Sequence, residues 1–259
     1  MTVGPTDEYS DDEYPGIDCA GNATINLVGK NIVEVNKRGD AGIFVREGST
    51  LTIGGTGSLE AYGGSQNNTS KGAGIGGYHI HGEKNGVNCG HIVINSGTIT
   101  AVGNTGCAGI GSGRRASCDG ITINGGTVTA SNDGEAADIG SGQNGSCGNI
   151  TISGGTVEAT GGNNAAGIGS GYWGKFTSIT ITNGITSVKA TRVVGDEEGY
   201  KPLPIGFGKN DRDNGSVTFG NRDMIFWGDL ESIVNDDEYG GIHIEVSNDG
   251  DVWTLTPAP

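Results

Sequence analysis

The chain has 259 residues, of which 33% are hydrophobic and 52 are glycine, well above the usual glycine share of ~7%. Its formal net charge of −15 excludes nucleic acid as a partner, because phosphate recognition requires a basic patch. No run of about 18 apolar residues occurs, so we expect no membrane span, and the acidic residues 1–15 lack the features of a signal peptide. If the protein is exported, we expect that its signal was removed ahead of residue 1.

Residues 16–70 contain short strand patterns that do not recur at a fixed spacing. In most of them apolar and polar residues alternate, which is typical of half-buried strands. The patterns are Ile25–Leu27, Ile32–Val35, Ile43–Val45, Leu51–Ile53 and Leu59–Ala61. We therefore predict irregular N-terminal coils that lead into a more regular region.

Residues 71–193 contain a repeat with a step of 29 residues. The segment Ala108–Gly113 returns at Ala137–Gly142 and again at Ala166–Gly171. An Ile-Thr-Ile triplet and a Gly-Thr-Val triplet keep the same step. A fixed period of this length is typical of a solenoid. Equivalent residues should then stack ~4.8 Å apart, the spacing of paired strands.

Each coil is predicted to contain three strands. The corner strand carries Ile-Gly, the second carries Ile-x-Ile, and the third carries Thr-Val-Thr or a close variant, so that Ile and Val point inward and threonines outward. Their central residues are Ile75, Ile110, Ile139, Ile168 and Ile205 (corner), Ile92, Ile121, Ile150 and Ile179 (second), and Ile99, Val128, Val157 and Val188 (third). We predict an all-β, single-stranded, right-handed parallel β-helix, since parallel crossovers are strongly biased to that hand.

Three of the five cysteines, Cys89, Cys118 and Cys147, share the 29-residue step, and Phe176 takes the next place. A position that accepts both Cys and Phe is typical of a buried packing column, in which a free Cys behaves as a small hydrophobe. A disulfide between neighbouring coils and a metal site are the alternatives. The paired Cys-x-x-Cys spacing of zinc sites is absent. Cys107 occupies the place of a small inward residue in its coil.

Residues 194–216 interrupt the repeat with an acidic insertion rich in residues that break strands. Residues 217–256 are predicted to form a last coil or cap, because the end of a solenoid would otherwise expose unpaired backbone groups. The expected strands there are Val217–Phe219, Met224–Phe226, Ile242–Val246 and Val252–Leu255. We predict a single β-helix domain over residues 1–259.

The turn after the corner strand holds the most varied side chains of the repeat, and we expect them in two stacked columns along one edge. The first column is Tyr78, Arg114, Gln143 and Tyr172, and the second is His79, Arg115, Asn144 and Trp173. Aromatic rings can stack on the apolar face of a sugar, while amide and guanidinium groups hydrogen-bond its hydroxyls. The edge is therefore a candidate glycan-binding site. The alternative is that these side chains only cover or stabilise the edge.

A second candidate site is acidic. Asp138 stands where the sister coils have glycine, and we expect it to point outward, near Asp133 and Glu135 of the preceding turn. These three carboxylates could bind Ca²⁺, which takes oxygen ligands. Alternatively, Asp138, Glu135 and Glu158 could act in a polysaccharide lyase or a glycoside hydrolase, whose two carboxyl groups stand ~5–9.5 Å apart. Arg114, about one coil earlier, would then supply the base of a lyase. A solvated acidic face is the remaining interpretation.

The repeat unit, Gly-Ile-Gly-Ser-Gly with a following turn and then Ile-Thr-Ile-x-Gly-Gly-Thr-Val-Thr-Ala, resembles the β-solenoid repeats of bacterial cell-surface proteins of the carbohydrate-binding-domain-containing type. The segments Ala41–Ile53 and Trp253–Pro257 are similar to those proteins as well, and the resemblance covers roughly residues 20–190. It implies an extracellular or cell-surface location and contact with polysaccharide or with a host or cell-wall glycan, sometimes with Ca²⁺. It carries over no catalytic residues.

We therefore expect a non-catalytic glycan-binding or adhesive module. A polysaccharide-degrading enzyme is the first alternative. A structural spacer or fibre segment that binds nothing through its coils is the second. An acidic solenoid with capped ends favours a monomer.

Overall fold

The computed structural model describes residues 2–3, 15–35, 39–64, 71–80, 82–195, 201–209, 215–223 and 240–259. These residues form strands and turns, and none of them belongs to a helix that could cross a membrane. The strand expected at Met224–Phe226 lies outside the described residues, as do the stretches 196–200 and 210–214 of the insertion.

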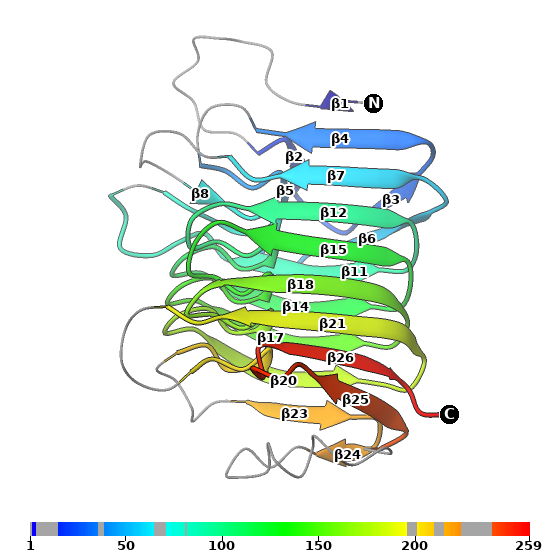
Figure 1. The fold of residues 1–259 in the computed structure, drawn as a ribbon. Coiled ribbons are helices and arrows are strands. Elements are labelled where there is room, and N and C mark those ends of the chain that lie inside the picture. The colour runs from blue at the N-terminus through cyan, green and yellow to red at the C-terminus, as the bar shows by residue number, and fades with distance from the viewer. Residues whose placement is uncertain are drawn as a thin grey trace.

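Three sheets run down the molecule and are named the front, corner and back sheets, in the order in which a coil visits them (Figure 1). The front sheet contains, in spatial order, β1 (Thr2–Val3), β4 (Lys30–Glu34), β7 (Ser58–Tyr62), β12 (Thr98–Gly103), β15 (Thr127–Asn132), β18 (Gly155–Asn163), β21 (Ile185–Val193), β26 (Val252–Pro257) and β25 (Ile242–Val246). The corner sheet contains β2 (Ile17–Cys19), β5 (Ile43–Val45), β9 (Ile75–Gly76), β13 (Ile110–Gly111), β16 (Ile139–Gly140), β19 (Ile168–Gly169) and β22 (Ile205–Gly206). The back sheet contains β3 (Ala23–Leu27), β6 (Thr50–Gly55), β11 (Cys89–Ile94), β14 (Ser117–Ile123), β17 (Ser146–Ile152), β20 (Lys175–Ile181), β23 (Ser216–Phe219) and β24 (Arg222–Asp223). A separate antiparallel pair joins β8 (Lys71–Gly72) to β10 (Tyr78–His79).

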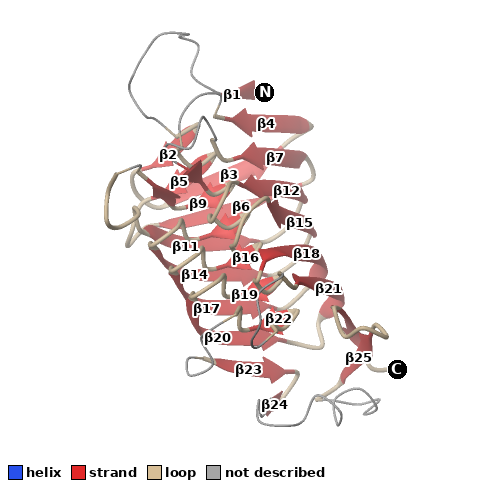
Figure 2. Ribbon diagram, turned by 60° about the vertical axis from the view of Figure 1, so that its left-hand side comes forward, coloured by secondary structure: helices blue, strands red, loops and turns tan. Residues whose placement is uncertain are grey.

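The coil is right-handed. In Figure 1 the parallel front strands from β4 to β21 point to the left and the parallel back strands from β3 to β23 point to the right, while the chain descends from its N-terminus. Figure 2 turns the short corner strands toward the viewer and shows them stacked between the other two sheets. The predicted right-handed parallel β-helix with three strands per coil is confirmed.

The 29-residue step places equivalent residues side by side, as predicted. Ile110 pairs with Ile139 in the corner sheet, and Ile121 pairs with Ile150 in the back sheet. All four side chains are fully buried, whereas Thr127 of β15 is exposed. Columns of β-branched residues therefore fill the interior, and the pleat turns the threonines to the outside.

The irregular coils join the same three sheets although their spacing varies. Strands β3 to β7 extend the sheets upstream, and Ile205 pairs with Ile168 downstream, as predicted. At the end of the front sheet, β25 and β26 form an antiparallel hairpin that packs on β21. Trp253 and Leu255 of this hairpin are fully buried. The hairpin thus covers the apolar interior of the last coil, which is the role of a cap.

The cysteine column is a packing column. Cys118 pairs in register with Cys89 on one side and with Cys147 on the other, and Phe176 follows. All five cysteines of the chain are buried free thiols, so the disulfide alternative is not adopted. The Cys118 thiol donates a weak hydrogen bond to the carbonyl oxygen of Gly90 at 3.4 Å. The thiols therefore serve as small apolar groups between stacked coils.

One glycine per corner strand is required by the backbone. Gly111 has φ of 137°, a conformation open almost only to glycine. A Cβ atom added there would lie 1.9 Å from the carbonyl oxygen of Gly140 in the next coil. The Ile-Gly signature of the repeat is thus the signature of a sharp, closely stacked corner.

Candidate functional site

The turn between each corner strand and the next back strand forms an edge of the solenoid. Arg115, Asn144 and Trp173 are exposed on it, with φ of 54°, 54° and 55°. The backbone N–H of Arg115 donates to the carbonyl oxygen of Gln143 at 2.9 Å, and that of Asn144 donates to Tyr172 at 2.9 Å. Over these three coils the structure brings the two predicted columns together.

The coil that begins with β9 departs from the predicted columns, because it lacks the serine of the Ile-Gly-Ser-Gly signature. Gly77 takes the place of Ser112, since each donates its N–H to the glycine of the next corner strand, at 2.9 and 3.0 Å. Tyr78 therefore lies beside Gly113, whose Cβ position is 2.6 Å from the backbone of Tyr78. His79 belongs to β10 and is buried. The predicted places of Tyr78 and His79 were wrong by one residue.

The edge presents an aromatic pair next to a carboxylate and an amide. The rings of Tyr172 and Trp173 meet edge to face, with centroids 6.0 Å apart, and Trp173 is 50% exposed. The side-chain amide of Gln143 donates to the carboxylate of Glu135, which stands on the turn before the corner strand. The backbone carbonyl of Glu135 also accepts the N–H of Tyr172 at 2.9 Å. These contacts hold the edge together and leave the Trp173 ring accessible.

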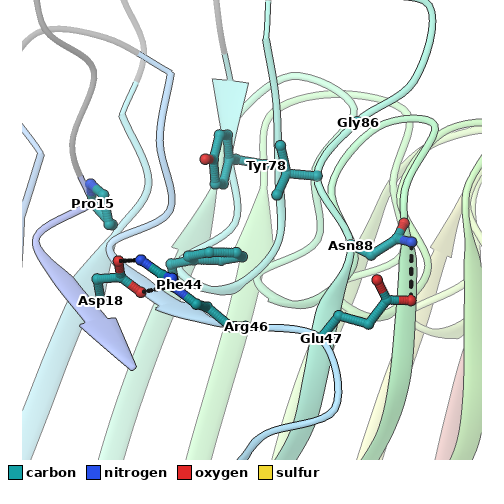
Figure 3. Close-up of a pocket in the computed structure, with 9 residues that line it drawn as sticks. Pro15, Asp18, Phe44, Arg46, Glu47, Tyr78, Gly86 and Asn88 are labelled. Carbon is teal, nitrogen blue, oxygen red and sulfur yellow. Dashed lines mark hydrogen bonds and ion pairs between the residues drawn. The ribbon is translucent and has the colours of Figure 1, made fainter. Parts of the chain in front are cut away.

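The displaced tyrosine lines a pocket of about 580 Å³ near the N-terminal end of the solenoid (Figure 3). We name it the Tyr78 pocket. Its lining residues are Pro15, Asp18, Phe44, Arg46, Glu47, Tyr78, Gly86, Val87 and Asn88. They come from three separate stretches of the chain that the coiling brings together.

Aromatic and charged groups face each other across this pocket. The rings of Phe44 and Tyr78 meet at an interplanar angle of 81°, with centroids 5.1 Å apart. The guanidinium of Arg46 donates to both carboxylate oxygens of Asp18, at 3.0 and 2.6 Å. On the other side of the pocket the chain also places the carboxylate of Glu47 (Figure 3). The site thus combines an apolar wall with groups that hydrogen-bond hydroxyls, which is the composition of a small-molecule site.

The pocket arises where the first coils depart from the repeat. Phe44 and Asp18 occupy the column that holds glycine in the later corner strands, as the pairing of Phe44 with Gly76 shows. The coil after β9 is longer, and the extra residues fold back so that Val87 bridges to Tyr78 with N–H to carbonyl distances of 2.7 and 3.4 Å. The sequence analysis did not predict that Asp18, Phe44 and Val87 belong to a site. The available signals were the side chains in a glycine column and the step of 35 instead of 29 residues between Ile75 and Ile110.

Asp138 does not point outward, as predicted, but is fully buried. Its carboxylate accepts hydrogen bonds from the side-chain amide of Asn132 at 2.6 Å and from the backbone N–H of Thr160. Burial raises the pKa of Asp138 well above its usual value, although these hydrogen bonds oppose the shift. The physical reason is that this position faces the gap between the corner and front sheets. At its sister Gly109, an added Cβ would lie 2.8 Å from the carbonyl oxygen of Ala101.

The predicted calcium ligands are therefore not gathered at one place. Asp133 accepts a hydrogen bond from the N–H of Thr105 at 2.5 Å, Glu135 binds Gln143, and Asp138 is enclosed. Among the residues that the structure describes, no group of three or more His, Cys, Asp or Glu side chains is placed to hold a metal ion. Each of the three carboxylates is thus engaged by its own hydrogen-bond partners, in its own coil or in a neighbouring one.

The remaining carboxylate candidate lies on the outside of the front sheet. Glu158 stands in register with Thr129, as predicted, and forms an ion pair with Lys189 at 2.8 Å. Both side chains are about half exposed, so the pair contributes at most ~1 kcal/mol. Because Asp138 is enclosed between sheets while Glu158 faces solvent, the two do not form an acid/base pair around a common substrate position.

Comparison with known proteins adds support for the architecture. A family model described as a beta helix repeat matches residues 92–114, 121–143 and 150–172. Each matched segment runs from a back strand through a front strand and a corner strand to the first residue of the edge. A search of curated proteins and a search of solved structures found no match to the chain. The strict coils are thus β-helix repeats, a fold that positions side chains without setting their chemistry.

Proposed function

We propose that this protein is a non-catalytic glycan-binding module whose main binding site is the Tyr78 pocket. As part of the proposal, it acts outside a cell or on a cell surface, as the resemblance to bacterial cell-surface solenoids implies. It acts as a monomer, which an acidic solenoid with capped ends favours. The exposed Trp173 edge serves as an accessory contact for the same class of ligand.

The observation that carries the proposal is the Phe44–Tyr78 aromatic pair beside the Asp18–Arg46 ion pair. A sugar ring has an apolar face and a rim of hydroxyls, so it fits a site that offers an aromatic wall and a polar wall at once. The volume of about 580 Å³ lies in the range of ~300–1,000 Å³ typical of small-ligand sites. One or two sugar units fit such a space.

The carboxylate geometry favours binding over catalysis. Glycoside cleavage needs two carboxyl groups on opposite sides of the scissile bond, ~5–9.5 Å apart. Asp138, the first candidate for a catalytic carboxylate, is enclosed and accepts hydrogen bonds from Asn132 and Thr160. In the Tyr78 pocket, the carboxylate of Asp18 is held in place by the guanidinium of Arg46, in an ion pair of 2.6 Å.

The test is a glycan array combined with assays for reducing ends and unsaturated products on the same preparation. The variant Tyr78→Ala should lower affinity for the bound glycans about tenfold through the loss of stacking. Tyr62→Ala is the matched control, since it removes a similarly half-buried ring from the outside of the front sheet. Product formation would overturn the non-catalytic assignment. Failure of the wild-type protein to bind any glycan would favour the spacer interpretation.

A further inference from the structure

The charges that line the Tyr78 pocket do not balance. The lining residues include two carboxylates, Asp18 and Glu47, and one cation, Arg46. The Arg46 guanidinium makes two hydrogen bonds to Asp18, at 3.0 and 2.6 Å, so this pair is neutral as a unit. Glu47 is left as the uncompensated charge of the lining.

The carboxylate of Glu47 is held in place but only partly engaged. The side-chain amide of Asn88 donates to its Oε1 at 3.2 Å. Asn88 is itself oriented, because its Oδ1 accepts the backbone N–H of Ser117 at 2.8 Å. Figure 3 shows the second oxygen of Glu47 on the side that faces the pocket. One acceptor of a fixed carboxylate is thus available to a ligand.

A second carboxylate strengthens the negative potential on this side. The N–H of Gly48, the residue after Glu47, donates to Oδ2 of Asp119 at 3.0 Å. Both Glu47 and Asp119 are exposed, Glu47 on the turn between β5 and β6 and Asp119 in strand β14, and the whole chain carries a net charge of −15. A cation entering the pocket is therefore attracted, and an anion is repelled.

We propose that the Tyr78 pocket selects sugars with a primary ammonium group, bound at Glu47, over N-acetylated and carboxylate-bearing sugars. The inference rests on the proposed glycan binding and names its ligand class. The ammonium donates to the available oxygen of Glu47, while the sugar ring packs against the Phe44–Tyr78 wall. An N-acetyl group carries no charge for Glu47, and a uronate places like charges together.

The experiment compares three soluble oligosaccharides of equal length by calorimetry: glucosamine, N-acetylglucosamine and galacturonate oligomers. The wild-type protein should bind the glucosamine oligomer about five- to tenfold more tightly than the acetylated one, and the galacturonate oligomer most weakly. The preference should shrink as salt rises, because the charges are partly exposed.

The variant Glu47→Gln keeps an acceptor for Asn88 and removes the charge, so it should fold normally and lose the preference. Glu245→Gln is the matched control, because Glu245 is exposed on β25 at the opposite end of the solenoid. Equal binding of both amino-sugar oligomers, or a preference that survives in Glu47→Gln, overturns the ammonium assignment and leaves glycan binding intact. Absence of binding to these oligomers and to every array glycan overturns the proposed function itself.

Discussion

The carboxylate of Asp138 accepts a hydrogen bond from the backbone N–H of Thr160, which belongs to the front strand of the following coil. The same carboxylate accepts the side-chain amide of Asn132, 2.6 Å away, in its own coil. Asp138 therefore ties two successive coils together at the junction of the front and corner sheets. Asp138, which departs from the glycine of the repeat, is thus used to bind the backbone of the next coil.

The first prediction concerns Asp138→Asn. Both partners of the carboxylate are hydrogen-bond donors, so the amide group of asparagine would place a donor against a donor. We expect the free energy of unfolding at neutral pH to fall by about 1–3 kcal/mol, measured by urea denaturation. An unchanged midpoint would show that the Asp138 hydrogen bonds are not formed in solution.

The difference in stability between the wild type and Asp138→Asn should depend on pH, and the direction of this dependence can be derived. Burial raises the pKa of Asp138 in the folded state above the value of ~3.9 expected in the unfolded state. The folded state thus binds the proton more tightly, and the stability of the wild type relative to Asp138→Asn should rise as pH falls through the raised pKa. The gain should be complete below about pH 4. Melting temperatures of both proteins across this range check it, and a difference that stays flat would contradict the burial of a titrating carboxyl.

The second prediction concerns the glycine of the corner strand. Gly111→Ala would place a Cβ 1.9 Å from the carbonyl oxygen of Gly140 at a φ of 137°. We expect a loss of at least about 3 kcal/mol, or failure to fold. Gly21→Ala is the control, since no atom lies within 4 Å of its Cβ position and its change should stay within ~0.5 kcal/mol. Similar urea midpoints for the two variants would contradict the close stacking of the corners.

The third prediction concerns thiol reactivity. Burial raises the pKa of Cys107 to about 12, so its reactive thiolate is scarce at neutral pH, and all five thiols are shielded from solvent by burial. A chromogenic thiol reagent should therefore react slowly with the folded protein. After unfolding without reductant it should count all 5 cysteines. A count of three would reveal a disulfide between two neighbours in the column, and rapid labelling of the folded state would contradict its burial.

The fourth prediction separates the edge from the pocket. Trp173→Ala removes a ring that is 50% exposed, so the stability should change by less than about 1 kcal/mol. Retention on glycan affinity gels should weaken less than in Tyr78→Ala, because the edge is an accessory contact. Val28→Ala is the control, because Val28 is another exposed apolar side chain and lies outside both the edge and the pocket lining. Unchanged retention of Trp173→Ala on every glycan bound by the wild type would remove the edge from the binding surface.

Much of the fold could be predicted because the repeat fixes the sequence distance between residues that are in contact. Ile110 and Ile139 occupy the same place in successive coils, so the 29-residue step alone predicts that they pair. The edge columns at Arg115 and Asn144 follow from the same step. Tyr78 was misplaced because Gly77 was matched to Gly113 as the glycine before the edge. In the structure Gly77 takes the place of Ser112, and its being a glycine does not by itself distinguish the two places.

The period of the sequence, together with the alternation of β-branched residues, determined the solenoid, its three strands per coil and the column of buried cysteines. It could do so because in-register stacking brings residues at equivalent positions of successive coils into contact. Only the tertiary structure decided that Asp138 is enclosed and that Asp18, Phe44 and Tyr78 share a pocket. Those positions depend on how non-equivalent turns pack at the junctions of the sheets, where no repeated neighbour constrains the direction of a side chain.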